Sequence, residues 1–261
     1  MKPVALSIAG SDPSGGAGIQ ADLKTFHQFG VYGEAVLTLL TVQNTTEVAA
    51  VHLIEPGLVV AQIRAVLVDI PPQAVKTGAL GNASIIRAVA AVLAEARLPL
   101  VVDPVMISKH GASLIADEAR EVLLAELLPL ATLVTPNLPE AEALTSLTVD
   151  SPASMKEAAR VLHAATGAAI LVKGGHLQGA ALDLLFDGDT FHEFTSERLW
   201  TPNTHGTGCT YSAAITAALA IGLELPEAVE RAKSYITEAI RTNPGLGRGA
   251  GPVNHHVHPI Q

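Results

Sequence analysis

The feature that most constrains this fold is an alternation along the chain, in which short apolar runs rich in Val, Ile, Leu and Ala are separated by longer helical segments. The apolar runs span residues 4–9, 35–42, 48–54, 74–77, 100–102, 132–135 and 169–172. The segments with helical patterning span residues 19–29, 56–68, 83–96, 116–128, 153–166 and 226–241. Strands that alternate with helices of this length form a mostly parallel sheet with helices on both faces. The sequence therefore predicts an α/β fold.

Two further features complete the predicted organisation. Residues 182–186 and 190–194 resemble strands and flank Asp187-Gly188-Asp189, a turn sequence typical of antiparallel β-hairpins. No linker, break in composition or internal repeat divides the 261 residues. A chain of this length can build one large core, so we expect a single domain spanning residues 1–261.

Composition argues against several classes of protein. The net charge is −9 and no run of basic residues occurs, which argues against a nucleic-acid-binding surface. No apolar run is long enough to cross a membrane, and residues 1–8 are too short for the apolar core of a signal peptide. The single cysteine excludes an internal disulfide framework. We therefore expect a cytoplasmic protein that binds neither nucleic acid nor membrane.

Polar side chains follow several of the predicted strands at the point where each strand ends. They are Asp103, Asn137 with Glu140, and Lys173. Because the carboxyl ends of the strands in an open α/β sheet line one crevice, we expect these residues to meet there. Each also has a purely structural explanation: a turn at Asp103-Pro104, a capping pair at Asn137 and Glu140, and an extended edge position for Lys173.

The stretch Gly206-Thr207-Gly208-Cys209 is a glycine turn that precedes an uncharged, Ala-rich helix over residues 210–222. The first turn of a buried helix has unpaired N–H groups and a positive dipole end, which suits a phosphate. The chain's only cysteine, Cys209, lies in this turn, where the helix end is expected to lower its pKa and make it a better base. The purely structural explanation is that the small residues only allow the helix to pack closely.

Together these groups suggest phosphoryl transfer, a reaction in which catalysis is mainly positioning and electrostatic stabilisation. The turn at residues 206–209 would hold the transferring group as an anion hole, and Lys173 would lie beside the nucleotide phosphates. Asn137 and Glu140 would position Mg²⁺, through waters because Mg²⁺ keeps much of its hydration. Cys209 would accept a proton from the acceptor hydroxyl.

A second glycine-rich segment offers a different interpretation. Gly16, Gly18 and Ala21 match the dinucleotide fingerprint G-x-G-x-x-G/A after a predicted strand, which would indicate a NAD-dependent oxidoreductase. However, the next strand ends in Gln43-Asn44 and offers no acidic partner for a ribose. The fingerprint is therefore weak support for that class.

The ordered set of motifs is similar to that of the hydroxymethylpyrimidine/phosphomethylpyrimidine kinases of thiamine biosynthesis, members of the ribokinase-like superfamily. The motifs that carry the resemblance are residues 10–25, 43–45, 103–106, 135–141 and 205–210. The similarity runs from about Val4 to Asn254. It implies a three-layer α/β/α fold and a homodimer. It also implies that ATP and Mg²⁺ are used to phosphorylate 4-amino-5-hydroxymethyl-2-methylpyrimidine, and then its monophosphate to the diphosphate.

The resemblance also implies roles for individual residues. Cys209 stands where most ribokinase-like kinases have an aspartate base, and Gln43 matches a glutamine that reads the aminopyrimidine. The other substrate-binding residues so implied are Asp22, Gly10 and Met106, and the ATP-binding residues are Asp103, Lys173, Thr135 and Lys233. Lys233 lies on the last helix, where a solvent-exposed position with no ligand explains it equally well.

Pyridoxal stays open as a second substrate, because some relatives with the same cysteine motif accept it and no motif here excludes it. A non-catalytic metabolite-binding protein would also keep the fold, although the intact Cys209, Asn137 and Glu140 argue against one. The loop 108–113 is a candidate cover for the site. The histidines at 255, 256 and 258 could suggest a metal site, but we expect a mobile tail there.

Overall fold

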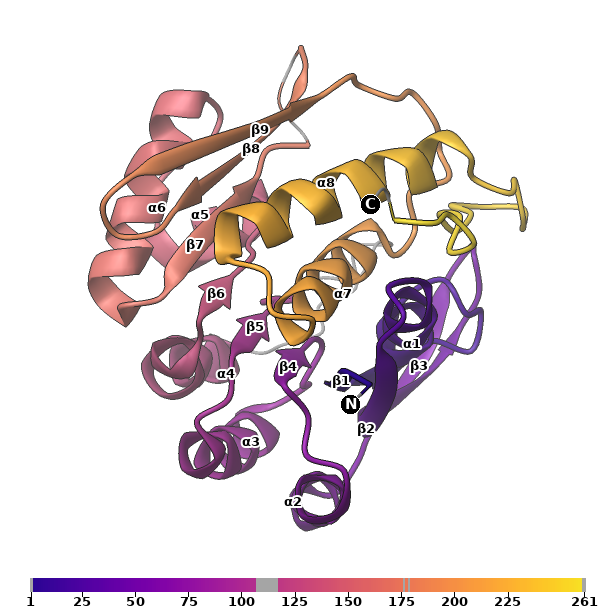
Figure 1. Cartoon of the computed structure of the whole chain (residues 1–261), viewed down its shortest axis with the longest axis vertical. Coiled ribbons are helices and arrows are strands. Elements are labelled where there is room, and N and C mark those ends of the chain that lie inside the picture. The colour runs from indigo at the N-terminus through magenta and orange to yellow at the C-terminus, as the bar shows by residue number, and fades with distance from the viewer. Residues whose placement is uncertain (1, 107–116, 176, 178, 260–261) are drawn as a thin grey trace.

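The computed structural model describes residues 2–106, 117–175, 177 and 179–259. Within them, one mixed sheet runs through the molecule in the order β3-β2-β1-β4-β5-β6-β7-β8-β9 (Figure 1). Its strands are β1 (Val4–Ser11), β2 (Tyr32–Gln43), β3 (Val48–Leu53), β4 (Ala74–Thr77), β5 (Leu100–Val102), β6 (Leu133–Val134), β7 (Ala169–Lys173), β8 (Ala181–Phe186) and β9 (Phe191–Ser196). The loop 108–113, predicted as a cover, lies outside the described residues.

The pairing of the strands confirms the predicted mostly parallel sheet. Neighbouring strands from β2 through β1, β4, β5 and β6 to β7 are parallel. At one edge β3 runs antiparallel to β2, because no helix separates the two strands in sequence and they can pair directly. At the other edge β7, β8 and β9 are antiparallel, and the predicted hairpin around Asp187-Gly188-Asp189 joins β8 to β9.

Helices cover both faces of the sheet and make three layers (Figure 1). They are α1 (Gly18–Gln28), α2 (Pro56–Asp69), α3 (Ala83–Ala96), α4 (Asp117–Val122), α5 (Leu138–Thr145), α6 (Pro152–Thr166), α7 (Thr207–Ala220) and α8 (Leu225–Arg241). Side chains alternate between the two faces along a strand. In β5, Leu100 and Val102 pack in the core with α2, α3 and α6, whereas Val101 packs in the core with α7 and α8.

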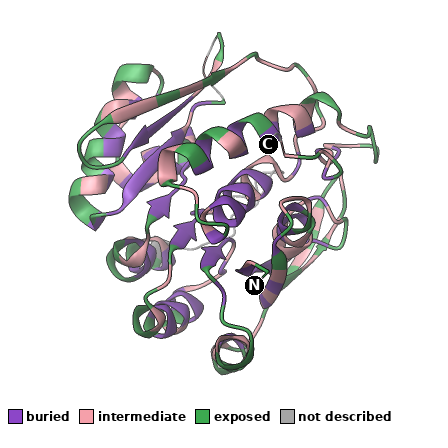
Figure 2. Cartoon of the chain, viewed as in Figure 1, coloured by how far each residue is buried: buried purple, intermediate pink, exposed green. Residues whose placement is uncertain are grey.

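Helix α7 is buried around most of its surface, as Figure 2 shows. All residues from Thr210 to Ala218 are buried, which confirms the buried helix predicted from the uncharged sequence. The helix lies against α1 on one side and α8 on the other, so no part of its circumference requires a charged residue. The first turn of α7 is thereby held firmly at the carboxyl edge of the sheet.

One predicted helix is shorter than expected. Residues 116–128 do not form a continuous α-helix: α4 ends at Val122, a π-helical turn spans Leu123–Leu127, and a 3₁₀ turn spans Leu128–Leu130. Pro129 lacks the N–H that an α-helix would need at that position, which favours the change of helix type. None of the helices in the described part of the chain is long and apolar enough to cross a membrane.

Candidate active site

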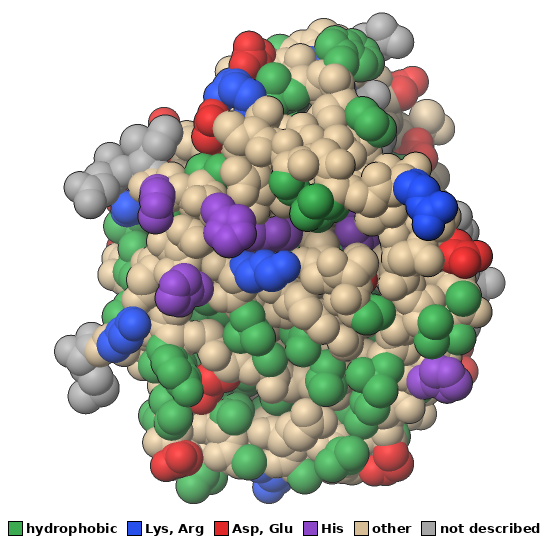
Figure 3. Space-filling view, turned by 90° about the vertical axis from the view of Figure 1, so that its right-hand side faces the viewer, with side chains coloured by type: hydrophobic (Ala, Val, Ile, Leu, Met, Phe, Trp, Pro, Cys, Tyr) green, Lys and Arg blue, Asp and Glu red, His purple; other side chains and the backbone are tan. Residues whose placement is uncertain are grey.

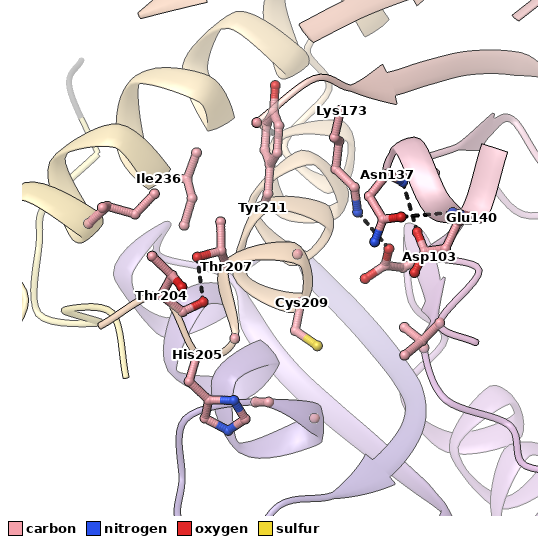
Figure 4. Close-up of a pocket in the computed structure, with 18 of the residues that line it drawn as sticks. Asp103, Asn137, Glu140, Lys173, Thr204, His205, Thr207, Cys209, Tyr211 and Ile236 are labelled. Carbon is pink, nitrogen blue, oxygen red and sulfur yellow. Dashed lines mark hydrogen bonds and ion pairs between the residues drawn. The ribbon is translucent and has the colours of Figure 1, made fainter. Parts of the chain in front are cut away.

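A cavity of about 750 Å³ opens at the carboxyl ends of the central strands. The anion-hole turn predicted at residues 206–209 lines one wall. Asp103, Asn137, Glu140 and Lys173 line the facing wall, and Figure 4 shows these four side chains grouped beside the start of α7. The prediction that these strand ends meet is therefore confirmed. They meet although as many as 106 positions separate them in sequence, from 103 to 209.

The turn itself depends on glycine at position 206. Gly206 has a φ of 78°, in the left-handed region, and a Cβ at this position would collide with the carbonyl of Gly16. A Cβ on Gly208 would lie 3.4 Å from Lys173 Nζ and 3.6 Å from Asp103 Oδ2. These are ordinary van der Waals distances, and they show that the two charged groups of the facing wall lie close to the N-terminus of α7, where backbone N–H groups can bind an anion.

Asp103 and Lys173 form an ion pair at the end of β5 and β7. Lys173 Nζ donates to Asp103 Oδ1 at 2.9 Å, and Thr135 Oγ1 donates to the same oxygen at 3.2 Å. Burial disfavours the charged carboxylate, but Lys173 and Lys76 outweigh it and lower the pKa of Asp103. Lys173 is likewise held charged, because Asp103 and Glu140 outweigh the effect of burial and raise its pKa. The hydrogen bond from Thr135 to Asp103 places Thr135 behind this carboxylate.

Asn137 and Glu140 form a capping box at the start of α5, which confirms the structural explanation of the pair. The Glu140 N–H donates to Asn137 Oδ1 at 2.9 Å, and the Asn137 N–H donates to Glu140 Oε2 at 2.8 Å. Both residues also line the cavity. Burial raises the pKa of Glu140, against the opposing pull of Lys173. The pair is thus structural and faces the site at the same time.

The thiol of Cys209 does not behave as the sequence predicts. Its sulfur points from the first turn of α7 into the cavity (Figure 4). Burial raises its pKa to about 11, although Lys76 and the Gly18 N–H both act to lower it. The expectation of a lowered pKa is wrong. Burial destabilises the thiolate more than the helix end and Lys76 stabilise it. Without a bound ligand, Cys209 is a protonated thiol.

Gln43, Gly10 and Met106, the residues for which the resemblance implies substrate binding, all line the cavity. His205 joins them: its Nε2 lies 2.7 Å from Asp12 Oδ2 and 3.3 Å from Gln43 Nε2. The role of His205 was missed from sequence, although it directly precedes the glycine turn. Because Nε2 donates to the Asp12 carboxylate, it cannot accept from the Gln43 amide, which stays available to a ligand in the cavity.

Asp22 does not line the cavity. It is fully buried on α1, where Lys76 Nζ donates to its Oδ1 at 2.5 Å and Ser7 Oγ donates to its Oδ2 at 2.6 Å. Burial raises its pKa, against the lowering effect of Lys76. Asp22 thus lies behind the cavity wall and is not placed to contact a substrate directly. Lys76 was missed, although a lysine within the apolar strand 74–77 was a usable signal.

Lys233 is buried, so the solvent-exposed explanation for it is wrong. Its Nζ donates to Asp183 Oδ2 at 2.7 Å and to the Ala181 carbonyl at 3.0 Å, and the residue lines the cavity. The cavity is also lined by residues that no motif identified, namely Arg198, Trp200, Thr201, Ile236 and Ile240. Lys233 and Lys173 are thus both lysines of the cavity wall that are paired with a buried aspartate.

The glycine-rich loop after β1 is not arranged as a dinucleotide site. Asp12 accepts hydrogen bonds from the backbone N–H groups of Ser14, Gly16 and Ala17, at 2.9, 3.2 and 2.9 Å. In a dinucleotide-binding loop these donors would face a pyrophosphate. Here a carboxylate of the chain itself occupies them, and the loop instead packs against His205.

The C-terminal segment is ordered against the site, so the expected mobile tail is wrong. The His205 N–H donates to the Gly251 carbonyl at 3.0 Å, and His255 Nε2 lies 3.0 Å from Thr210 Oγ1. Val253 is buried in the core with α7 and α8. Burial lowers the pKa of His255 to about 4, so its imidazole is neutral. Among the described residues, no group of three or more His, Cys, Asp or Glu side chains is placed to hold a metal ion.

The fold has three layers, α/β/α, and its anion-binding helix start faces a Lys–Asp pair. These features define a kinase of the ribokinase-like class. Residues 12–254 match the family described as phosphomethylpyrimidine kinase, and the chain belongs to that family. The hydroxymethylpyrimidine/phosphomethylpyrimidine kinase of Synechococcus elongatus is 47% identical over 97% of both chains. The thiamine biosynthesis bifunctional protein ThiED of Geobacter sulfurreducens is 55% identical over 96% of this chain, which spans only 51% of that protein.

Solved structures share the fold. The phosphomethylpyrimidine kinase of Clostridium difficile is 45% identical, with a TM-score of 0.82 over 92% of this chain and 100% of that one. The pyridoxal kinase of Bacillus subtilis, solved as an ADP complex, is 40% identical, with a TM-score of 0.90 over 98% of both chains. Two substrate classes thus occur on closely similar structures.

Proposed function

We propose that this protein transfers the γ-phosphoryl group of ATP to the hydroxymethyl oxygen of 4-amino-5-hydroxymethyl-2-methylpyrimidine. In a second reaction it phosphorylates the resulting monophosphate to the diphosphate. Both are reactions of thiamine biosynthesis, and the family and its curated relatives support them. We further propose that residues 1–261 act as one kinase domain, because the single sheet joins elements from Val4 to Ser196.

The observation that carries this proposal is that one cavity brings together Gln43, the turn at residues 206–209 and the Lys173–Asp103 pair. Gln43 lies beside His205, which directly precedes the turn. Trp200 and Ile236 belong to the segment after β9 and to α8, which also line this cavity. A pyrimidine beside Gln43 and ATP beside Trp200 and Ile236 would bring hydroxyl and γ-phosphoryl group together at the start of α7. Its volume, about 750 Å³, lies in the range of ligand-binding sites.

The residues at the centre supply what phosphoryl transfer requires. The N–H groups of the turn hold the oxygens of the transferring group, and Lys173 balances negative charge on the phosphates from the facing wall. Cys209 accepts the proton of the attacking hydroxyl as the oxygen–phosphorus bond forms. Since the resting thiol is protonated, it must lose its proton before it can serve as this base.

The site also fits a hydrated Mg²⁺ that is held through its water molecules. Asn137 Oδ1 and Glu140 Oε2 already accept hydrogen bonds within the capping box, so neither oxygen is fully free for direct coordination. Both residues line the cavity and present carbonyl and carboxylate groups, which suits a cation that keeps most of its water. When bound, Mg²⁺ would neutralise charge on the ATP phosphates.

A turnover assay with ATP tests the substrate assignment. Hydroxymethylpyrimidine, its monophosphate and pyridoxal would be compared at equal concentrations, with product identified by mass spectrometry. We expect both pyrimidines to be phosphorylated. Turnover of pyridoxal alone would contradict the proposal.

Pyridoxal kinase activity is the second candidate, and the likeness to the Bacillus subtilis pyridoxal kinase favours it. The cavity gives a reason why one site could accept both compounds. Gln43 can donate or accept a hydrogen bond, and the apolar Met106 side chain can contact either aromatic ring. The ratio of kcat/KM for pyridoxal to that for hydroxymethylpyrimidine measures this second activity.

We also propose a homodimer formed through the β2–β3 edge of the sheet. Apolar side chains exposed on these strands are Tyr32, Leu40, Val42, Val51 and Leu53. Figure 3 looks onto the side of the molecule where this edge lies and shows hydrophobic side chains spread over its lower part. Exposed apolar residues gathered on one sheet edge are typical of an interface. Sedimentation of the wild type and of Val42→Glu tests the proposal, which predicts that the variant is a monomer.

A further inference from the structure

A fully buried ion pair lies directly beneath the anion-hole turn. It joins Lys76 on β4 to Asp22 on α1, with Nζ and Oδ1 2.5 Å apart and both side chains 0% exposed. Lys76 Nζ also donates to the backbone carbonyl of Cys209 at 3.2 Å. Neither Lys76 nor Asp22 lines the cavity, so neither is placed to touch a substrate.

Stability alone is a poor explanation for this pair. Taking two charges out of water costs several kcal/mol, and an apolar pair of the same size is often as stable or more stable. The lysine is instead placed where a positive charge acts on the catalytic turn. A Cβ on Gly78, which lines the cavity, would lie 4.0 Å from Lys76 Nζ, so the ammonium group is separated from the cavity by little more than a glycine.

Lys76 and Asp22 each make a second hydrogen bond besides the one that joins them. Asp22 accepts from Lys76 on one oxygen and from Ser7 Oγ on the other, at 2.6 Å. Lys76 in turn divides its donors between Asp22 and the Cys209 carbonyl. Moving either charge therefore changes the electrostatic potential at the first turn of α7.

We propose that Lys76 is a positioning residue for the phosphoryl transfer, which holds the Cys209 turn from below and supplies the positive charge that stabilises the thiolate. The negative charge of Asp22 opposes that of Lys76 and so determines how strongly the pair stabilises the thiolate. This inference rests on the proposed function of Cys209 as the base. It assigns Asp22 an indirect role in place of contact with substrate.

Further charged and polar groups also face Cys209. Asp103 at the end of β5 opposes ionisation of the thiol, and the Gly18 N–H at the start of α1 favours it. Lys173 on β7 also interacts electrostatically with the thiolate. None of these changes in the variants below, so their contributions cancel in a comparison. Because Cys209 is the only cysteine, every thiol measurement on the whole chain reports on this one group.

The test is the rate of alkylation by iodoacetamide between pH 7 and 11, since only the thiolate reacts. The deciding comparison is Asp22→Asn against the double variant Asp22→Asn with Lys76→Met. Both lack the Asp22 charge, so they differ only in Lys76, which supplies both the positive charge and the hydrogen bond to the Cys209 carbonyl. We expect Asp22→Asn to be alkylated about tenfold faster than the double variant at the same pH. This ratio corresponds to a thiol pKa that is lower by one unit. Equal rates in the two variants would overturn the proposal.

Asp22→Asn against wild type gives a second readout that does not require the double variant to fold. We expect faster alkylation in the variant, because Lys76 keeps its charge and loses its partner. Lys24→Met is the matched control, since Lys24 is an exposed lysine on the same helix and should leave the rate unchanged. An Asp22→Asn rate equal to that of wild type would also overturn the proposal.

The pH profile of kcat separates this inference from the proposed function. If Cys209 is the base, the rising limb of the profile in Asp22→Asn moves to lower pH together with the thiol titration. If the thiol titration moves and the profile stays, the effect of Lys76 on the thiol stands and the role of Cys209 as the base fails.

Discussion

Lys173 and Asp103 face the start of α7 as a pair, with Nζ and Oδ1 2.9 Å apart at the ends of β7 and β5. The pair lies where the phosphates of ATP are expected, 3.4 and 3.6 Å from the position of a Cβ on Gly208. A ligand phosphate would compete with Asp103 for the lysine. The carboxylate thus keeps Lys173 charged and in place until the nucleotide arrives.

Replacing Lys173 with Met should reduce kcat/KM for ATP by about a hundredfold, because the phosphates lose their closest positive charge on this wall. It should also lower the free energy of unfolding by roughly 3–5 kcal/mol, since Asp103 is left buried and without its partner. Steady-state kinetics and urea unfolding measure the two effects.

The double variant Lys173→Met with Asp103→Asn separates them, because it restores stability while activity stays low. Lys156→Met is the control, because Lys156 on α6 is also a lysine paired with a carboxylate but does not line the cavity; it should leave ATP kinetics unchanged and lower the stability by at most about 1 kcal/mol. Normal ATP kinetics in Lys173→Met would show that the nucleotide phosphates lie elsewhere.

Removing the thiol with Cys209→Ala should lower kcat by about a hundredfold or more while ATP still binds, as calorimetry would show. In the wild type, kcat should rise with pH. The folded-state pKa is raised to about 11, so the thiolate fraction increases throughout the range below it. That rise should be missing in Cys209→Ala. Near-normal turnover in the variant would mean that residue 209 contributes only its backbone N–H.

Asn137→Ala should weaken the response to Mg²⁺ by about tenfold in apparent affinity, and it should cost about 1 kcal/mol of stability through the lost helix cap. Ser151→Ala is the matched control, because Ser151 caps α6 with the same kind of capping box. It should show a similar loss of stability and an unchanged Mg²⁺ titration. Identical titrations for the two variants would refute the proposed metal position.

The buried His255 should make the protein acid-sensitive. Its folded-state pKa is lowered to about 4, below the unfolded value near 6.5, so its stabilisation is present above pH 6.5 and is lost as the pH falls toward 4. Between pH 7.5 and 5 this histidine should account for about 2 kcal/mol of lost stability. Urea unfolding of His255→Gln should show that much less acid sensitivity.

His256→Gln is the comparison for that experiment, because His256 is the exposed neighbour in the same segment. Its unfolding should depend on pH as the wild type does. If His255→Gln retains the full acid sensitivity, the loss of stability arises from other groups.

Much of the fold and half of the site could be predicted because the information is local. Apolar runs, turn residues and the uncharged sequence after Cys209 each determine structure within a short stretch. The meeting of Asp103, Asn137 and Lys173 then follows from a general property of parallel sheets. No side-chain detail is needed for either step.

What could not be predicted depends on sums over distant elements. The pKa of Cys209 is set by burial together with groups on α1, β4 and β5, and a sequence contains no measure of how these balance. The ordered C-terminal segment depends on contacts with His205 and Thr210, about forty-five residues earlier in the chain. The cavity wall at Arg198 and Trp200 carries no motif, because lining a cavity by shape and surface requires no fixed residue type at a fixed spacing.

The contacts between the C-terminal segment and the anion-hole turn affect how the enzyme can be made. His205 is paired with Gly251, and Thr210 with His255, so the turn is complete only after residues 251–255 have been synthesised and have folded back. A nascent chain that already contains β1 to α8 would hold the sheet and the cavity walls without a finished anion hole. Catalytic competence would therefore follow the formation of the sheet and the cavity walls during translation.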